Sequence, residues 1–289
     1  MELELEPITP VLGARVRIGA ADVLRPGVAE ALLAALDRHD VLVFPRIGID
    51  DDTFLALTAA LGEKHEVKAT DDGSAASGKG IFRVARDKDD RTQREFILGN
   101  DFWHIDGMNY AVPVKATLLK CERAPREGGD TGFASLRAAW EALPAARREA
   151  LAPLRVGHCL SACLRRLYDA PTAADFARWD AVFARVEHPL AWRRRDGQTT
   201  LLIGSTANDI AGMDAAEGRA LLDELVEWST QERFTLRHHW HDGDLVIFHN
   251  AGLLHRSYPY GDGAGRVMHR TTLKGSEATT SGGAAALAY

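Results

Sequence analysis

The sequence predicts an α+β protein built on a β-sandwich or jelly roll, with helices at its flanks. Short strand-like segments are scattered along the whole chain, whereas segments with helical spacing lie mostly near its beginning or between strands. The chain has 289 residues, of which 46% are hydrophobic and 26% are charged. This composition is typical of a soluble globular protein, and the length suits one or two domains.

The first sixty residues are predicted to form a strand, a helix, a strand and a helix. Apolar residues recur at helical spacing over 28–36 and again over 54–61, and a short apolar strand at 42–44 lies between them. The second helix is expected to end at Gly62, because glycine is favoured directly after the last helical turn.

The next part of the chain has a different composition. Residues 69–100 combine turn-forming residues with a dense run of charge, which predicts a surface loop or a lid. Residues 115–121 are then predicted to form a buried strand. Ser135 is the expected N-cap of a short helix that Pro144 ends, and residues 175–187 are expected to be helical.

A further helix is predicted after residue 214. Asp214 and Glu217 form a candidate capping box at its start, with Leu221, Leu225 and Trp228 on its inner face. The tail after residue 275 is small and polar and is expected to be loose. The remaining predicted strands are 199–203, 234–240, 244–248 and 267–273.

Charge and cysteine content exclude several classes of protein. The 35 Lys and Arg residues face 41 Asp and Glu, for a net charge of −6 without a basic stripe, which argues against a nucleic-acid partner. The apolar runs are too short to cross a bilayer, and the start of the chain lacks the order of a signal peptide, so we expect a cytoplasmic protein. Cys121, Cys159 and Cys163 fit a reducing compartment and are interpreted as buried thiols.

Residues 102–106 carry a His-x-Asp pair, His104 and Asp106. On a strand, these two side chains would project from the same face and could converge on one point. An imidazole and a carboxylate are two of the three ligands of the facial triad that binds Fe(II) and leaves positions open for substrate and oxygen. Because a His-x-Asp pair alone often arises by chance, this interpretation depends on the rest of the chain.

A pair of arginines near the C-terminus points to a bound anion. On an extended strand Arg266 and Arg270 would face the same way, and His269 would face the other way. No acidic residue is near them in sequence, and two guanidinium groups are costly to bury unless an anion arrives. A dicarboxylate cosubstrate is such an anion, because arginine pairs with carboxylates in bidentate fashion. A structural ion pair is the alternative role for Arg270.

An ordered set of motifs gives a resemblance across nearly the whole chain. It comprises Trp103-His104-Ile105-Asp106, Gly128-Gly129-Asp130-Thr131, Gly243-Asp244-Leu245, His255 and Arg266-Val267-Met268-His269-Arg270. The gaps are 24 residues from Asp106 to Thr131, 123 from Thr131 to His255 and 10 from His255 to Arg266. In motifs and spacing the sequence resembles the taurine dioxygenase/TfdA family of Fe(II)- and 2-oxoglutarate-dependent dioxygenases. The resemblance implies one domain over residues 1–275, with a double-stranded β-helix (jelly roll) core and flanking helices, and a loose tail at 276–289.

The resemblance also implies roles for individual residues. His104, Asp106 and His255 would hold the iron, and Thr131 and Arg266 would bind the distal carboxylate of 2-oxoglutarate. His249 is a competing candidate for the third ligand, and residues 249–251 depart from the motif that the family often carries there.

Three further residues are expected at the anionic and substrate parts of the site. Arg270 corresponds to residues that contact either the keto-acid end of the cosubstrate or an acidic substrate. His65 and Asn100 correspond to substrate contacts. Residues 68–99 and 157–196 match the family poorly, so the substrate itself is not predicted.

The expected reaction is oxidation, most simply hydroxylation, of an unactivated C–H bond in a small molecule, anionic or natural-product-like. O₂ and 2-oxoglutarate would be consumed, with release of succinate and CO₂. Desaturation, epoxidation and ring expansion are alternatives within the same chemistry. Two other classes are considered: a zinc hydrolase or lyase, and a non-catalytic jelly-roll binding protein. The resemblance leaves a homo-oligomer open.

Overall fold

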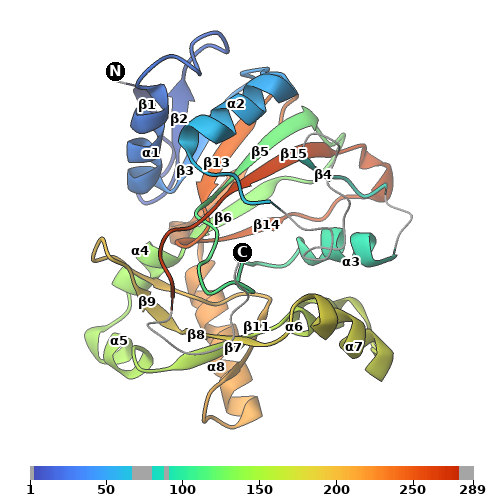
Figure 1. Ribbon diagram of the computed structural model, residues 1–289. Helices are drawn as coiled ribbons and strands as arrows, with labels where there is room; N and C mark the ends of the chain where they lie inside the picture. The colour runs from blue at the N-terminus through green and yellow to red at the C-terminus, as the bar shows by residue number, and fades with distance from the viewer. Residues whose placement is uncertain (1–2, 67–79, 88–90, 280–289) are drawn as a thin grey trace.

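The computed structural model describes residues 3–66, 80–87 and 91–279. Its largest sheet has seven strands, in the order β1-β2-β3-β13-β5-β15-β4. The pairs are antiparallel except for the parallel pair of β2 and β3. The strands are β1 (Glu4–Pro7), β2 (Ala14–Arg17), β3 (Val41–Phe44), β4 (Phe82–Val84), β5 (Ala116–Arg123), β13 (Leu245–His249) and β15 (Val267–Leu273). Strands from both ends of the chain therefore share one sheet (Figure 1).

A second sheet, β12-β6-β14, faces the large one. Its strands are β6 (Thr131–Ser135), β12 (Thr235–His238) and β14 (Leu253–Ser257). The core between the two sheets contains Phe133 of β6 and Phe248 of β13, both buried, with ring centroids 5.1 Å apart. The predicted β-sandwich is confirmed, because the two sheets enclose a shared core.

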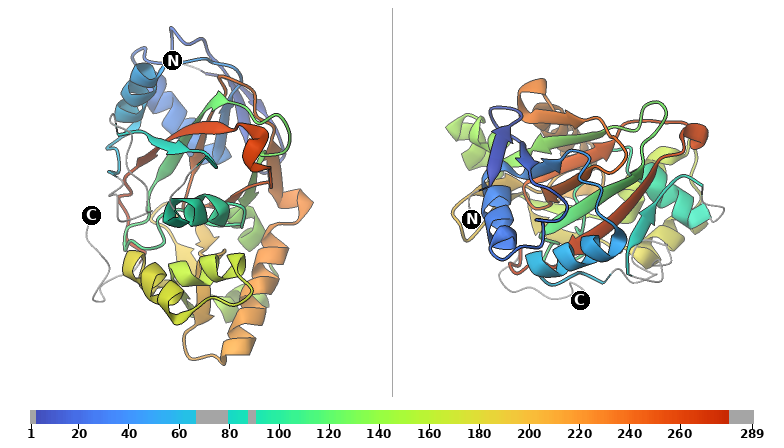
Figure 2. Two further views of the ribbon diagram at one scale, coloured as in Figure 1. Left: turned by 90° about the vertical axis from the view of Figure 1, so that its right-hand side faces the viewer. Right: turned by 90° about the horizontal axis from the view of Figure 1, so that it is seen from above.

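Two helices, α1 (Val28–His39) and α2 (Asp51–Leu61), cover the outer face of the large sheet (Figure 2, right). Leu32 and Leu36 of α1 and Phe54 and Leu57 of α2 are buried in the core under these helices. The predicted end of α2 is confirmed, because Gly62 is its C-cap.

The remaining elements form a lower layer that packs on the outer side of the small sheet (Figure 1). This layer contains the three-stranded sheet β11-β7-β8 and the hairpin β9-β10. Helix α3 (Arg91–Gly99) lies between the large sheet and α6–α7 (Figure 2, left). The strands are β7 (Arg155–His158), β8 (Val186–Pro189), β9 (Ala191–Arg193), β10 (Thr199–Leu201) and β11 (Ala207–Ile210), and the helices are α4 (Leu136–Glu141), α5 (Ala145–Leu151), α6 (Leu160–Leu164), α7 (Ala173–Val182) and α8 (Ala215–Ser229).

Three predictions of secondary structure were wrong in part. Residues 80–100 form β4 and α3 rather than one loop, whereas residues 67–79 and 88–90 lie outside the described residues. The helix predicted over 175–187 ends at Val182, where Phe183 turns to an extended conformation that leads into β8. Residues 102–106 contribute only an isolated β-bridge instead of a strand.

The helix and the tail near the C-terminus also differ from expectation. In α8, Gly218, Leu222 and Leu225 are buried, whereas Leu221 and Trp228 are only partly buried, because Gly218 allows the helix to approach the backbone of β11. The tail is held at least to Thr279, whose backbone N–H donates to the Ala111 carbonyl over 2.9 Å. Residues 280–289 lie outside the described part of the chain.

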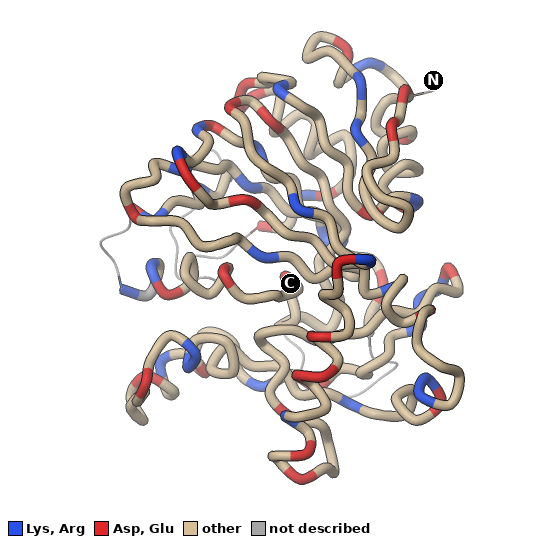
Figure 3. The backbone as a smooth tube through the Cα atoms, turned by 180° about the vertical axis from the view of Figure 1, so that it is seen from behind, with Lys and Arg blue, Asp and Glu red and all other residues tan. Residues whose placement is uncertain are grey.

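Acidic and basic residues alternate along the chain trace in Figure 3 rather than gathering by sign. Within the described residues, no helix has both the length and the apolar character needed to cross a membrane.

Candidate active site

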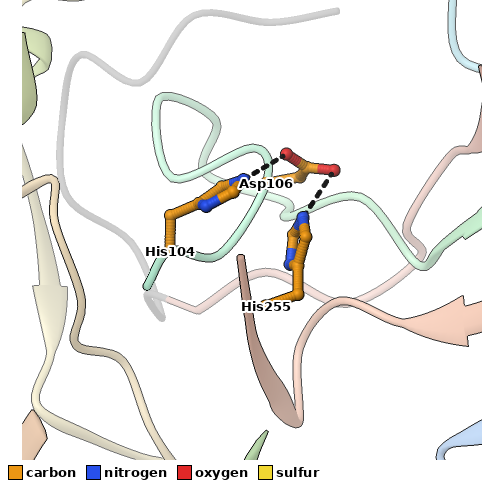
Figure 4. Close-up of side chains that lie close together, drawn as sticks. All are labelled: His104, Asp106 and His255. Atoms are coloured by element: carbon orange, nitrogen blue, oxygen red, sulfur yellow. Dashed lines mark ion pairs between the residues drawn. The ribbon is translucent and has the colours of Figure 1, made fainter. Parts of the chain in front are cut away.

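The site forms where the chain after α3 meets β14. The backbones of His104 and His255 bond to each other in both directions, with N···O distances of 3.0 and 2.9 Å. This isolated bridge brings together two histidines that are far apart in the sequence. Asp106, two residues after His104, turns its carboxylate toward both rings (Figure 4).

The potential ligand atoms of His104, Asp106 and His255 all lie within 4.8 Å of one another. The Nε2 atoms of His104 and His255 lie 3.7 Å from the Asp106 Oδ1 and Oδ2 atoms, respectively (Figure 4). Two imidazoles and one carboxylate thus converge on one point, the arrangement that mononuclear non-haem Fe(II) sites use.

The histidines of this cluster are held neutral. Burial lowers the pKa of both rings, that of His255 to about 3. The His104 Nδ1–H donates to the Phe102 carbonyl over 2.8 Å, so its Nε2 carries the lone pair that faces Asp106. Burial alone would raise the pKa of Asp106, but the charge of nearby Arg270 and the hydrogen bond from Thr117 lower it, so the carboxylate is charged. This donor set fits a divalent metal ion.

Asp106 is oriented by two residues of the large sheet. The Thr117 hydroxyl of β5 donates to Asp106 Oδ2 over 3.1 Å, and the Asn250 side-chain amide donates to Thr117 Oγ1 over 2.8 Å. Sequence reasoning missed Thr117. The sequence did carry one signal for this role: Thr117 lies inside a strand predicted to be buried, and a buried hydroxyl needs a hydrogen-bonding partner.

Arg266 and Thr131 lie together beside the metal-ligand cluster. The Arg266 Nη2 atom is 3.4 Å from Thr131 Oγ1, and its Nε donates to the Gly129 carbonyl. Arg266 is only 5% exposed, and within the described residues no carboxylate pairs with it. An unpaired buried guanidinium is costly, so this position fits the carboxylate of a bound anion. Burial lowers the pKa of Arg266.

These groups share one cavity with about 420 Å³ of empty space, its opening included. The cavity is lined by the residues predicted to bind iron and 2-oxoglutarate, together with Asn100: His104, Asp106, Thr131, His255, Arg266 and Arg270. A bulge between Val267 and Met268 at the start of β15 replaces the regular strand expected there, and the two arginines still reach the same cavity.

Arg270 lies between the cluster and a second cavity. Its Nη1 atom is 3.8 Å from Asp106 Oδ1, a long ion pair, and its Nε has no hydrogen-bonding partner among the described residues. The guanidinium lies 4.9 Å from the centre of the Phe82 ring. His269 faces the other way, as predicted, with its Nδ1 2.8 Å from Asp51 Oδ1.

The second cavity adjoins the first and has about 900 Å³ of empty space, its opening included. His65 and Asn100, both predicted to contact substrate, line it together with Arg270. The His65 Nε2 lies 3.3 Å from the hydroxyl of Tyr110. Most of the remaining wall is apolar and comes from α3, α6 and neighbouring segments, including Phe96, Met108, Leu160, Leu164 and Phe183.

Other histidines lie outside the cluster. The interpretation of His249 as third ligand was wrong, because its Nε2 lies 3.2 Å from Asp37 Oδ1 on the far side of β13. Three more histidines, predicted to lie on the strand or its rim, pair with Asp130 or Asp244: His238, His239 and His241.

A second group of possible metal ligands consists of Asp51, Glu122 and His269. The Lys120 ammonium already lies 2.6 Å from a carboxylate oxygen of both Asp51 and Glu122. Because this buried cation balances the two carboxylates, the group is a structural ion-pair cluster.

Comparisons with known proteins agree with this geometry. Residues 4–272 match the family described as "Taurine catabolism dioxygenase TauD, TfdA family". The (S)-phenoxypropionate/alpha-ketoglutarate-dioxygenase of Delftia acidovorans is 29% identical, over 96% of this chain and 97% of its own length. The alpha-ketoglutarate-dependent 2,4-dichlorophenoxyacetate dioxygenase of Cupriavidus pinatubonensis is 31% identical, over 94% of this chain and 98% of its own length. The crystal structure of AAD-2 in complex with Mn(II) and N-oxalylglycine superposes with a TM-score of 0.84 at 28% identity, over 96% and 100% of the two chains.

Fold, site and relatives together define an Fe(II)- and 2-oxoglutarate-dependent dioxygenase, which uses O₂. The chain belongs to the TauD/TfdA family. The zinc hydrolase and the non-catalytic binding protein considered from the sequence are not supported by these relatives.

Proposed function

We propose that this enzyme hydroxylates an unactivated C–H bond of a small organic acid with an apolar body, and that His104, Asp106 and His255 hold its iron. When bound, Fe(II) and 2-oxoglutarate supply the oxidising chemistry, with consumption of O₂ and release of succinate and CO₂. The protein's contribution is to hold the reactants in place, exclude water and fix the charges around them.

Arg266 and Thr131 would bind the distal carboxylate of 2-oxoglutarate. Arg266 offers a buried guanidinium without a carboxylate partner among the described residues, and Thr131 adds a hydroxyl 3.4 Å away. The Trp240 indole N–H donates to Thr131 Oγ1 over 2.9 Å, so the hydroxyl proton is free to point toward the anion. The coexistence of this guanidinium and the His–Asp–His cluster in one cavity is the observation that carries the proposal.

Arg270, His65 and Asn100 would position the substrate. Arg270 brings one positive charge to a cavity whose other walls are mostly apolar, which favours an anionic group attached to a hydrocarbon or aromatic body. The relatives named for phenoxypropionate and 2,4-dichlorophenoxyacetate support such an acid as substrate. The ring of His65 is packed edge-on against that of Tyr110, which restrains it at the cavity wall.

A spectroscopic titration tests the proposed iron site. Adding Fe(II) and 2-oxoglutarate without oxygen is expected to produce a weak visible charge-transfer band in the wild type. The band should disappear in His255→Ala and persist in the control variant His249→Ala, whose histidine lies on β13, the preceding strand in the chain. A band that persists in His255→Ala, or that is lost only in His249→Ala, would contradict the assigned ligand set.

The substrate class is tested by succinate release with a panel of small acids. Phenoxyacetate and an alkanesulfonate are expected to stimulate release, whereas phenol, which has the ring without the separate anionic group, is not. Stimulation by phenol but by none of the acids would overturn the proposed role of Arg270.

We further propose that residues 1–275 form a single catalytic domain in the cytoplasm. The seven-stranded sheet joins β1–β3 to β13 and β15, which supports one domain. The three cysteines are free and buried, as suits a reducing compartment.

A further inference from the structure

A pair of buried histidines lies behind the substrate cavity, outside the metal-ligand cluster. His158 of β7 and His188 of β8 are both 0% exposed, and their ring centroids lie 5.5 Å apart in an edge-to-face arrangement. In the register of these strands His158 pairs with Val186 and His188 with Val156, so the two histidines are diagonal neighbours on one face of the sheet.

Both rings make the same two kinds of hydrogen bond. The Nε2 of His188 lies 2.8 Å from the Met108 carbonyl, and that of His158 lies 3.2 Å from the Leu202 carbonyl. A carbonyl oxygen only accepts, so Nε2 carries the proton in each ring. Burial lowers the pKa of both histidines, and the neutral rings therefore accept at Nδ1 from a threonine hydroxyl.

The threonine partners differ in position. For His158 the donor is Thr206, at 2.8 Å, and for His188 it is Thr279, at 2.7 Å, whose hydroxyl oxygen also lies 3.3 Å from the Ala111 carbonyl. Thr206 and Met108 both line the cavity that we assign to the substrate. Met108 follows the proposed ligand Asp106 by two residues, so the ring of His188 holds a piece of cavity wall beside the metal-ligand cluster.

Thr279 belongs to a segment that crosses the loop at 107–113. Its backbone N–H donates to the Ala111 carbonyl over 2.9 Å. Nearer to β15, Gly275 lies so close to Pro113 that a Cβ atom there would be 1.9 Å from the Pro113 carbonyl oxygen. The segment at 274–279 is thus fitted against this loop at both of its ends.

We propose that His188 is a positioning residue for the substrate. Its neutral ring connects Thr279 to Met108, and it thereby fixes the distance between the loop at 107–113 and the iron ligands. The role rests on the proposed function, because it takes the cavity beside Met108 as the substrate site. A small displacement of a positioned reactant can lower the rate of reaction strongly. With a loosened loop, more 2-oxoglutarate would therefore be consumed without oxidation of the substrate.

Hydrogen exchange in the metal-free enzyme tests the connection without any substrate. Because the Thr279 hydroxyl also reaches the Ala111 carbonyl of this loop, the substitution is made at His188 itself. Amides of the peptide 107–115 are expected to exchange about 3- to 10-fold faster in His188→Leu, the effect of one hydrogen bond, and at a rate nearer to that of the wild type in His188→Gln, which keeps an N–H for the Met108 carbonyl. Equal rates in His188→Leu and wild type would overturn the proposal.

The functional consequence is measured with phenoxyacetate as the probe. For His188→Leu we expect several-fold fewer oxidised phenoxyacetate molecules per succinate released, with the KM for 2-oxoglutarate unchanged. His188→Gln, which keeps an N–H for the Met108 carbonyl, should recover part of this ratio. An unchanged ratio in His188→Leu with faster 2-oxoglutarate turnover contradicts the positioning role. A wild type that does not oxidise phenoxyacetate contradicts only the substrate assignment. In that case the hydrogen-exchange rates decide whether His188 holds the loop.

Discussion

Arg266 shows how one residue can serve binding at the expense of stability. The guanidinium is buried and lacks a carboxylate partner among the described residues, and its polar contacts include the Gly129 carbonyl and the hydroxyls of Thr131 and Tyr260. Replacing a buried charge by an apolar side chain of similar size often stabilises a fold. Under the proposed function, the anion that balances this charge is the cosubstrate, which explains why the charge is kept.

For Arg266→Met we expect opposite effects on stability and on binding. The ligand-free variant should be more stable than the wild type by about 1–2 kcal/mol, because an uncompensated buried charge is gone. Stabilisation by 2-oxoglutarate should be lost, with at least a tenfold increase of its KM. Thermal unfolding with and without 2-oxoglutarate measures both effects, with Arg38→Met, at an exposed position on α1, as control. A destabilised variant that still binds 2-oxoglutarate would refute this interpretation.

Several residues of the site could be predicted from the sequence because their types and spacing resemble those of a known family. His104, Asp106, His255, Thr131 and Arg266, which the resemblance implied for one site, line one cavity. Thr117 and Asn250 could not be assigned in this way, since their contribution depends on the register between β5 and β13, which only the folded sheet defines.

Among the elements, α3 is one whose burial the sequence pattern did not predict. The charged run at 87–95 predicted exposure, yet Glu95 is only 2% exposed. Arg178 and the Trp179 indole N–H donate to its carboxylate, as does the Tyr168 hydroxyl. These partners come from α7 and the segment before it, so no local pattern could reveal that the helix is buried on this side.

We expect Glu95→Gln to loosen α3 from α7. Arg178 would keep only Asp175 as a charged partner, and breaking its buried ion pair with Glu95 costs about 2–4 kcal/mol. Because Phe96 and Asn100 line the substrate cavity, the KM for substrate should rise more than the KM for 2-oxoglutarate. Urea unfolding and steady-state kinetics measure these effects, with Glu149→Gln on the exposed side of α5 as control. If Glu95→Gln changed the unfolding free energy and the KM values no more than the control does, the ion pair would not anchor α3.

The strands differ in how well the sequence predicted them. β3, β5, β13 and β15 lie within two residues of the predicted strands, because their apolar residues are continuous and flanked by turns. β7, β8 and β14 are short and carry polar or charged residues, including His158, His188 and His255, whose burial depends on specific partners. Their sequences therefore lack the alternation that marks an ordinary strand.

For the whole molecule, the buried neutral histidines predict a loss of stability in mild acid. Burial lowers the pKa of His104, His158, His188 and His255 below the value of an exposed histidine, to about 3 for His158 and His255. Between about pH 6.5 and pH 3 the unfolded chain binds more protons than the folded one, so stability is fully present above pH 6.5 and falls as pH decreases. Each such group contributes up to about 1.4 kcal/mol per pH unit.

Urea unfolding of the metal-free enzyme at pH 7.0 and 5.5 measures this loss. His158→Gln should lose about 1 kcal/mol less than the wild type over this interval, because one titrating group is removed. If His158→Gln and the wild type lost the same free energy over this interval, this buried histidine would not be a source of the acid sensitivity.

The order of strands in the large sheet has a consequence for how the protein is made. β13 lies between β3 and β5 and pairs with both, although it follows them by more than a hundred residues in the chain. While the ribosome is still extending the chain, the facing edges of β3 and β5 stay unpaired and open to wrong contacts. The proposed third iron ligand, His255, leaves the ribosome later still. Iron can therefore be loaded only after synthesis of most of the chain, and a nascent protein depends on protection of its sheet edges until that moment.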